Sequence, residues 1–290
     1  MLKRVDRVQI AVTDRAGAER TASEVLGAEL VRRDVAAPLH ARRTTMQAGT
    51  SLLELLEPDG AGPVRDFLEA WGGGLFAGGF SVDDLDAAAQ HLERIDARFE
   101  RADGQLFLDP SATCGMRAVI SVHHERAPVG AIRSIYEVTN LVADWHAAAD
   151  RYAKLFALDA AKFSPLTSAQ FGYAGTLTMF DPPARLDRIE ISQITDYNLA
   201  MGRFHKRRGD SLYMFYVETD DAGAIAKRLE ARGGRFAAEP PDQAGIRNGF
   251  IHPGSFLGVL VGVSRTEHAW TWSGDPERAR RAAAARAPQF

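Results

Sequence analysis

The sequence predicts an α+β fold in which a module of one strand, one helix and three strands occurs four times. One observation behind this is an internal repeat, because residues 66–99 can be laid over residues 203–236 at a single offset. The matched positions are Phe67 with Phe204, Asp84 with Asp221, Leu92 with Leu229 and Phe99 with Phe236. The other is the order of hydrophobic patterns, which indicates strand, helix and three strands twice in each half. We therefore interpret the chain as a tandem duplication.

Composition and charge exclude several classes of protein. The 290 residues are enough for two domains with their own cores, and 46% are hydrophobic and 25% charged, as in globular proteins. A net charge of −3 gives no basic field for nucleic acid, and no run of roughly 18 apolar residues predicts a membrane span. The start MLKRVDRVQIAV lacks the apolar core of a secretion signal, and Cys114 is the only cysteine. We expect a cytoplasmic protein without nucleic-acid or membrane partners.

The first predicted elements are a strand over residues 5–14 and a helix over about 15–26. In the strand, VDRVQIAVTD, apolar residues alternate with Arg7 and Gln9, so the two sets face opposite sides of a sheet. Gly27 is expected to end the helix, since glycine readily adopts the left-handed backbone that is common at helix ends.

Further strands and one helix complete the first half. SLLELLEP (51–58) is predicted to be a strand that ends at Pro58, because proline cannot donate to a sheet. GGLFAGGFSV (73–82) is predicted to be a strand and residues 83–95 a helix. The apolar face of that helix consists of Leu85, Ala88, Ala89 and Leu92. Three more short strands fit before Val122.

The scheme repeats after a polar stretch, HHERAPVGA (123–131), whose proline and glycine are typical of a linker. The elements predicted in the second half are a strand at 132–140, a helix at 141–156 and strands at 187–194, 211–219 and 258–263. The predicted division is an N-terminal domain at 1–122, a C-terminal domain at 132–265 and a tail at 266–290. The Arg/Ala-rich part of the tail, from about Asp275, is interpreted as a helix or a frayed end with a solvated face.

Four segments resemble the vicinal oxygen chelate superfamily, which includes glyoxalases, bleomycin resistance proteins, methylmalonyl-CoA epimerases and extradiol dioxygenases. They are VDRVQIAVTD (5–14), SLLELLEP (51–58), GGLFAGGFSVDDLD (73–86) and FIHPGSFLGVLVGV (250–263). The last segment, with His252-Pro253 before Gly258-Val259-Leu260, looks most like the epimerase branch. The resemblance extends to about residue 265 and implies four βαβββ modules paired into two tandem half-open barrel domains.

Members of this superfamily hold a divalent metal inside the barrel, commonly with His, Glu or Gln, His and Glu. The resemblance places these four ligands at Arg7, Glu54, Ala77 and Val119 in one half, and at Arg133, Glu190, Met214 and Gly262 in the other. Each half thus keeps one carboxylate, whereas a tightly held divalent ion commonly needs three or more protein ligands. We expect no cofactor, and the alternative is a divalent metal held by unusual ligands.

In both halves arginine replaces the first histidine of the superfamily pattern, and the glutamate remains. We expect each guanidinium to lie about where the metal would, with Arg7 forked onto Glu54. In the same way Arg133 is expected to pair with Glu190. The alternative is that both are buried ion pairs that fix strand register and have no chemical role.

The C-terminal barrel is the predicted active cavity because it gathers more ionisable side chains. Tyr216 and Glu218 follow Met214 on the cavity-facing side of their strand, and Glu137 shares a strand face with Arg133. Several acids near one arginine favour opposed pKa shifts, which mark working sites. The alternative for Tyr216 and Glu218 is a place in water at the barrel rim.

The favoured function is a metal-independent isomerase, epimerase or lyase that acts on a small enolisable carbonyl compound. Arg133 would stabilise the enolate oxygen, and Glu190 or Glu137 would remove the proton. Tyr216 or His252 would return it, although His252, in the turn HPGS, could equally only cap that turn. The candidate substrate-binding residues are Met214, Glu218, Arg7 and Glu54.

Two other functions are compatible with the resemblance. A protein that sequesters a small molecule, as drug-resistance members do, would also have lost its metal ligands. An extradiol dioxygenase, which the four-module length suggests, needs two histidines and a carboxylate, and both histidines are missing from the matching positions. The expected partner is a small-molecule substrate, and a homodimer is a further expectation because assembly is common for this fold.

Overall fold

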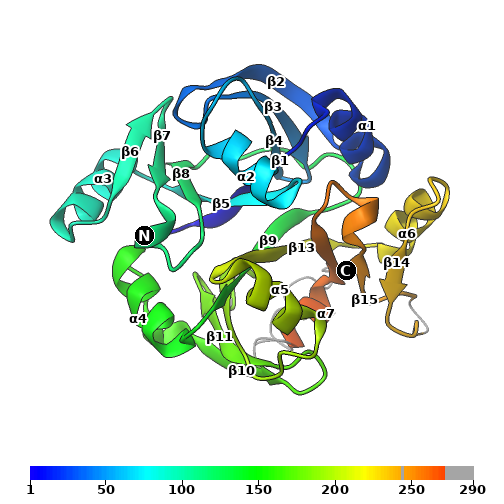
Figure 1. Cartoon of the computed structure of the whole chain (residues 1–290). Helices are drawn as coiled ribbons and strands as arrows, with labels where there is room; N and C mark the ends of the chain where they lie inside the picture. The colour runs from blue at the N-terminus through cyan, green and yellow to red at the C-terminus, as the bar shows by residue number, and fades with distance from the viewer. Residues whose placement is uncertain (243–244, 272–290) are drawn as a thin grey trace, which may run out of the picture.

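The computed structural model describes residues 1–242 and 245–271, and it contains two eight-stranded sheets. Their strand orders are β2-β3-β4-β1-β5-β8-β7-β6 and β10-β11-β12-β9-β13-β16-β15-β14. The same order therefore occurs twice, and each sheet curls into a half-open barrel (Figure 1). The expected α+β fold of four paired βαβββ modules is confirmed.

The N-terminal half consists of two modules joined by helix α2. The first contains β1 (Arg4–Ala11), α1 (Arg15–Leu26), β2 (Glu29–Ala36), β3 (Ala41–Ala48) and β4 (Ser51–Pro58), and α2 spans Pro63–Trp71. The second contains β5 (Gly74–Val82), α3 (Leu85–Arg94), β6 (Phe99–Ala102), β7 (Gln105–Leu108) and β8 (Ala118–Val122).

The C-terminal half repeats this arrangement and adds a short last helix. Its first module contains β9 (Ser134–Val142), α4 (Trp145–Leu155), β10 (Ser164–Ser168), β11 (Tyr173–Met179) and β12 (Arg188–Ile194), and α5 spans Ala200–Arg208. Its second contains β13 (Ser211–Thr219), α6 (Ala222–Glu230), β14 (Phe236–Ala238), β15 (Asn248–Ile251) and β16 (Leu260–Arg265), followed by α7 (Thr266–Thr271).

An aspartate begins the helix of every module. The side chain of each accepts a hydrogen bond from a backbone N–H of the first helical turn, which would otherwise lack a partner. These four N-cap residues are Asp14, Asp84, Asp144 and Asp221. Helix α1 has the predicted bounds and ends at Gly27, whose φ of 68° is left-handed.

The prediction was wrong about the start of the second half. Strand β9 covers Ser134–Val142 rather than 132–140, and α4 begins at Trp145 rather than at residue 141. The reason is the cap, because the Asp144 side chain accepts from the backbone N–H groups of His146 and Ala147 and so fixes where the helix starts. The shift changes which residues of β9 correspond to those of β1.

One apolar cluster connects the two halves. Val8 and Ile10 of β1 belong to it, as do Val138 of β9 and Phe215 of β13, all fully buried. The sheets thus pack against each other through β1, β5, β9 and β13, and α1 lies beside α6 at their junction (Figure 1). Asp187, just before β12, accepts from the Val5 backbone N–H at 2.7 Å and strengthens this junction.

The helices between modules, α2 and α5, lie across the mouths of their barrels (Figure 1). They contact each other where Arg208 of α5 lies over aromatic rings of α2. The Arg208 guanidinium at the end of α5 lies 4.8 Å from the ring centre of Trp71 in α2 and 4.9 Å from that of Phe204. The predicted tail helix from about Asp275 lies outside the described residues. No helix in the described part of the chain has the length and apolar character of a membrane span.

We predict that Asp144→Ala lowers the free energy of unfolding by about 1 kcal/mol, because the first turn of α4 loses its cap. Urea unfolding followed by circular dichroism measures this change. Asp144→Asn is the matched control, since it keeps an acceptor oxygen and should lose clearly less. Equal losses in both variants would contradict capping as the cause.

Candidate functional site

The interior of the N-terminal barrel contains the predicted ion pair. Arg7 Nη1 donates to Glu54 Oε1 at 2.7 Å, and Gln9 Nε2 donates to Glu54 Oε2 at 2.8 Å. Both members of the ion pair are buried. The expected pairing of Arg7 with Glu54 is therefore confirmed, but through one bond, because the fork formed by Arg7 Nε and Nη2 is on Asp6.

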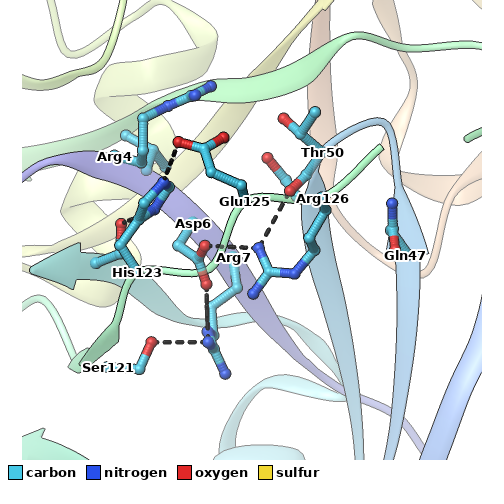
Figure 2. Close-up of polar contacts among 12 residues, drawn as sticks. Arg4, Asp6, Arg7, Gln47, Thr50, Ser121, His123, Glu125 and Arg126 are labelled. Atoms are coloured by element: carbon cyan, nitrogen blue, oxygen red, sulfur yellow. Dashed lines mark hydrogen bonds and ion pairs between the residues drawn. The ribbon is translucent and has the colours of Figure 1, made fainter. Parts of the chain in front are cut away.

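Arg7 is also bonded on its other side (Figure 2). Its Nη2 donates to Asp6 Oδ2 at 2.8 Å and to the Ser121 hydroxyl, and Arg126 of the linker donates to Asp6 Oδ1 at 2.8 Å. Burial opposes ionisation of Asp6, but the two arginines outweigh it and hold the pKa of this carboxyl below its usual range. The N-terminal charges are thus compensated by one another and form a closed network.

The predicted ion pair between Arg133 and Glu190 is wrong. Arg133 precedes β9, and its guanidinium pairs with Asp220 at 2.6 Å on the surface, where the Arg133 side chain is 46% exposed. The β9 residue at the position of Arg7 is Glu137, since Arg7 lies opposite Gly79 and Glu137 lies opposite Tyr216 in the equivalent strand pairs. Aligning the caps Asp14 and Asp144 would have identified this register from the sequence.

The arginine of the C-terminal barrel is Arg188, which the sequence analysis did not identify. Its Nε donates to Glu137 Oε2 at 2.5 Å, and both side chains are buried. Arg188 is two residues before Glu190 on β12, so the two side chains share a strand face. The sequence DRIEIS, with Arg188 two residues before Glu190, could therefore have identified Arg188 as a residue of the barrel interior.

Glu190 lies beside this pair and has an unusual protonation equilibrium. The Ser192 hydroxyl donates to its Oε1 at 2.6 Å, and the Thr139 hydroxyl lies 3.3 Å from its Oε2. Burial, and then the negative charge of Glu137, raise the pKa of Glu190 to about 8. Two carboxyls and one guanidinium therefore share the barrel interior, and near neutral pH Glu190 carries a proton.

These groups line a cavity of about 360 Å³ in the C-terminal barrel. Its polar wall consists of Glu137, Thr139, Arg188 and Glu190, and its aromatic wall of Tyr136, Tyr173, Tyr213, Tyr216, Phe171 and Phe250. Leu199, Ala200 and Met201 at the start of α5 cover it. Of the predicted residues, Glu137, Glu190, Tyr216 and Met214 are brought together here.

The tyrosines of the cavity are neutral hydrogen-bonding groups. Burial raises the pKa of Tyr213 to about 12 and holds the pKa values of Tyr173 and Tyr216 well above the ordinary value of tyrosine. In the part of the chain that the structure describes, the lining contains no lysine and no histidine. A bound molecule would meet aromatic faces, phenol hydroxyls and one compact charged cluster.

The other predicted residues lie elsewhere. His252 is exposed, and its Nδ1 accepts from the Gly254 backbone N–H at 3.1 Å, so it caps the 3₁₀ turn Pro253–Ser255. The Glu218 carboxylate is buried and accepts from the Thr266 hydroxyl outside the cavity. The remaining two candidates, Arg7 and Glu54, belong to the other barrel.

The donor set does not fit the divalent metal of the superfamily. Among residues 1–242 and 245–271 there is no group of three or more His, Cys, Asp or Glu side chains that could hold an ion. The cavity offers two carboxyls, and the one on Glu137 is already paired with the cation Arg188. Three protein ligands are the norm, and a neighbouring guanidinium repels a metal ion.

Comparisons with known proteins agree with this architecture. The family model described as Glyoxalase/Bleomycin resistance protein/Dioxygenase superfamily matches residues 4–111. No curated protein matches the sequence significantly. A triple mutant of 4-hydroxymandelate synthase from Streptomyces coelicolor is similar in structure, with a TM-score of 0.69 at 13% identity over 91% of this chain and 92% of the other.

Two further solved structures are similar at low sequence identity, one over most of this chain and the other over less than half of it. A fusion of a xylose isomerase-like TIM barrel with 4-hydroxyphenylpyruvate dioxygenase has a TM-score of 0.65 at 14% identity, over 91% of this chain and 49% of the fusion. Methylmalonyl-CoA epimerase from Mycobacterium tuberculosis has a TM-score of 0.40 at 22% identity, over 46% and 88% of the chains.

At these identities the two matches with TM-scores of 0.69 and 0.65 support the fold alone, so the activities of those proteins do not transfer. The match at residues 4–111 and the repeated strand order agree with the resemblance expected from the sequence motifs. Residues 4–111 thus match the model of the glyoxalase/bleomycin resistance protein/dioxygenase superfamily, and the C-terminal half repeats the strand order of the N-terminal half.

Proposed function

We propose that the C-terminal cavity catalyses proton transfer at a carbon next to a carbonyl group, as an isomerase, epimerase or lyase that uses no metal. The single observation that carries this proposal is Glu190, a buried carboxyl with a pKa of about 8 in a small-molecule cavity. A general base works best when its pKa lies near the operating pH, and few side chains other than a tuned carboxyl or histidine meet that condition.

Glu190 is the proton carrier of this proposal. In its ionised form it takes a proton from the carbon, and in its protonated form it returns one. Return by Glu190 to the same carbon regenerates the substrate, whereas return to a neighbouring carbon is isomerisation. Epimerisation needs a second donor on the other face of the enolate, a role for which the Tyr216 hydroxyl lines the cavity. If a leaving group departs from the β-carbon before the return, the reaction is an elimination. All three share the enolate that forms first.

Arg188 takes the role that the sequence analysis gave to Arg133. An enolate oxygen needs a fixed positive charge or hydrogen-bond donors in a site with little water. Arg188 lines the cavity, and Glu137 holds its Nε while the Ala269 carbonyl accepts from its Nη1 at 3.2 Å. Glu137 is therefore a positioning residue, and Tyr216 contributes a neutral hydroxyl to the same space.

The second candidate function is binding without chemistry. The aromatic wall favours it, since tyrosine and phenylalanine rings bind flat molecules with little loss of side-chain freedom. The two proposals differ in one observable. A carbonyl compound that binds in the cavity exchanges its α-protons with solvent only if the cavity catalyses enolisation.

We predict that the wild-type protein exchanges the α-protons of at least one small ketone or 2-oxo acid with deuterated water, measured by proton NMR across a panel. Glu190→Gln should slow this exchange by about a hundredfold or more, because the variant loses its proton carrier. Glu190→Asp keeps a carboxyl and should retain part of the rate. Binding of a panel member by wild type without exchange would favour the sequestration function.

A second prediction concerns stability and pH. The folded-state pKa of Glu190, about 8, exceeds its ordinary value of 4.5, so the folded protein holds this proton more tightly. The resulting stabilisation is complete below pH 4.5 and is lost as the pH rises to 8. Glu190→Gln, which resembles the protonated form, should flatten this fall in urea unfolding measured at several pH values. Parallel curves for wild type and variant would contradict the raised pKa.

A third prediction concerns metal. Elemental analysis of the purified protein should find divalent ions far below one equivalent, and a chelator should leave α-proton exchange unchanged, because too few ligands are available. Added Mn²⁺, Co²⁺ or Zn²⁺ should not increase the rate. A stoichiometric ion, or a rate that falls on chelation and returns with metal, would contradict a metal-independent reaction.

A further inference from the structure

We propose that the N-terminal barrel contains a second binding site, which takes a small organic oxyanion such as a carboxylate or a phosphate. The site is a cavity of about 530 Å³ at one end of this barrel. Its walls come from β1 to β4, the turn between β6 and β7, the start of β7, the end of β8 and the linker after it. Polar side chains that line it include those of Arg7, Arg32, Thr45, Gln105, Arg126 and Asp103.

The duplication provides an internal control, because the equivalent space in the C-terminal half is filled. Gln47 pairs with Leu52 in one half as Met179 pairs with Arg188 in the other. In the C-terminal half Met179 belongs to a buried cluster with Ala269 and Trp270 of α7. In the N-terminal half β8 continues into the linker, and no helix occupies this end among the described residues. The opening is thus specific to one copy of the fold.

Two buried donors face this cavity without a protein partner. Thr45 and Gln105 are 1% and 3% exposed, and neither Thr45 Oγ1 nor Gln105 Nε2 has a hydrogen-bond partner among the described residues. Arg43 Nη1 donates to Oε1 of the Gln105 side-chain amide at 2.9 Å. This bond fixes the orientation of the amide, so Nε2 is the atom that lacks a partner. Buried polar atoms without partners are rare, and here both can donate to an acceptor.

The equivalent amide in the C-terminal half is satisfied. Gln105 and Asn248 occupy matching places, opposite Ser121 and Ser264. Asn248 donates to Glu239 at 3.1 Å and accepts from Ser264 at 2.8 Å. An unpaired amide is therefore not a general property of this strand position, and its occurrence beside an open cavity indicates a missing acceptor.

The guanidinium groups around the cavity are N–H donors, although their charges are paired within the protein. Arg7, Arg32 and Arg126 line it beside Asp103. Arg7 pairs with Glu54 and Asp6, Arg126 pairs with Asp6, and Arg32 pairs with Asp34. Asp6 lies behind this wall and binds both Arg7 and Arg126, which holds them in place (Figure 2). Carboxylate and phosphate oxygens accept from hydroxyl, amide and guanidinium donors alike. A ligand with several such oxygens would use Thr45, Gln105 and an arginine together.

The test is binding of succinate, citrate and inorganic phosphate, each at constant ionic strength, by thermal shift and titration calorimetry on the full chain. At least one of them should raise the melting temperature of the wild type and bind stoichiometrically. Tighter binding of succinate or citrate would identify the ligand as a carboxylate, and tighter binding of inorganic phosphate would identify it as a phosphate. Thr45→Val and Gln105→Leu should weaken binding at least tenfold, and Thr45→Ser, which keeps the hydroxyl, should restore it.

A second readout uses the unliganded protein. Thr45→Val should leave its melting temperature unchanged or higher, because an unpaired buried hydroxyl is costly and its removal relieves that cost. A lowered melting temperature would show that the hydroxyl is already satisfied and would overturn the proposal. Failure of all three probes to stabilise the wild type, or equal binding by all variants, would also overturn it. The cavity lies in the other half from Glu190, so neither result depends on the proposed reaction.

Discussion

A carboxylate inside a half-open barrel must be neutralised, and the two halves of this chain meet that constraint differently. Glu54 and Glu190 occupy matching places on β4 and β12, and both are buried. An isolated buried charge costs several kcal/mol, so each needs a cation or a proton. Glu54 receives a guanidinium from Arg7. Glu190 keeps a proton because burial, and then the negative charge of Glu137, raise its pKa, while Arg188 is engaged by Glu137. One barrel therefore holds a buried ion pair, and the other holds a carboxyl whose pKa is raised to about 8.

The difference arises from an exchange of residue types between two neighbouring strands. In the N-terminal half the cation Arg7 is on β1, and its neighbour on β4 is apolar Leu52. In the C-terminal half the matching residues are Glu137 and Arg188, so the cation has moved to the other strand and a second acid replaces it. The duplicated fold thus holds the same backbone positions while the local charge pattern decides where a proton resides.

The fold could be predicted almost completely from the sequence, and the site only in part. Alternating strands and the Gly27 helix end are local signals, whereas the Arg7–Glu54 pair followed from the resemblance to the superfamily's ligand pattern. The second-half register depended on Asp144, a cap whose effect is confined to one helical turn, and missing it substituted Arg133 for Glu137. The pairing of Arg188 with Glu137 and the pKa of Glu190 depend on distances between strands that sequence spacing does not contain.

The apolar cluster shared by β1, β5, β9 and β13 has a consequence for the chain as a folding unit. Each half uses the outer face of the other sheet as a wall, so either half alone would expose buried valine, isoleucine and phenylalanine side chains to water. We therefore expect the two halves to unfold cooperatively, so that a core substitution in either half destabilises both. The C-terminal cavity therefore keeps its shape only while the N-terminal half is folded.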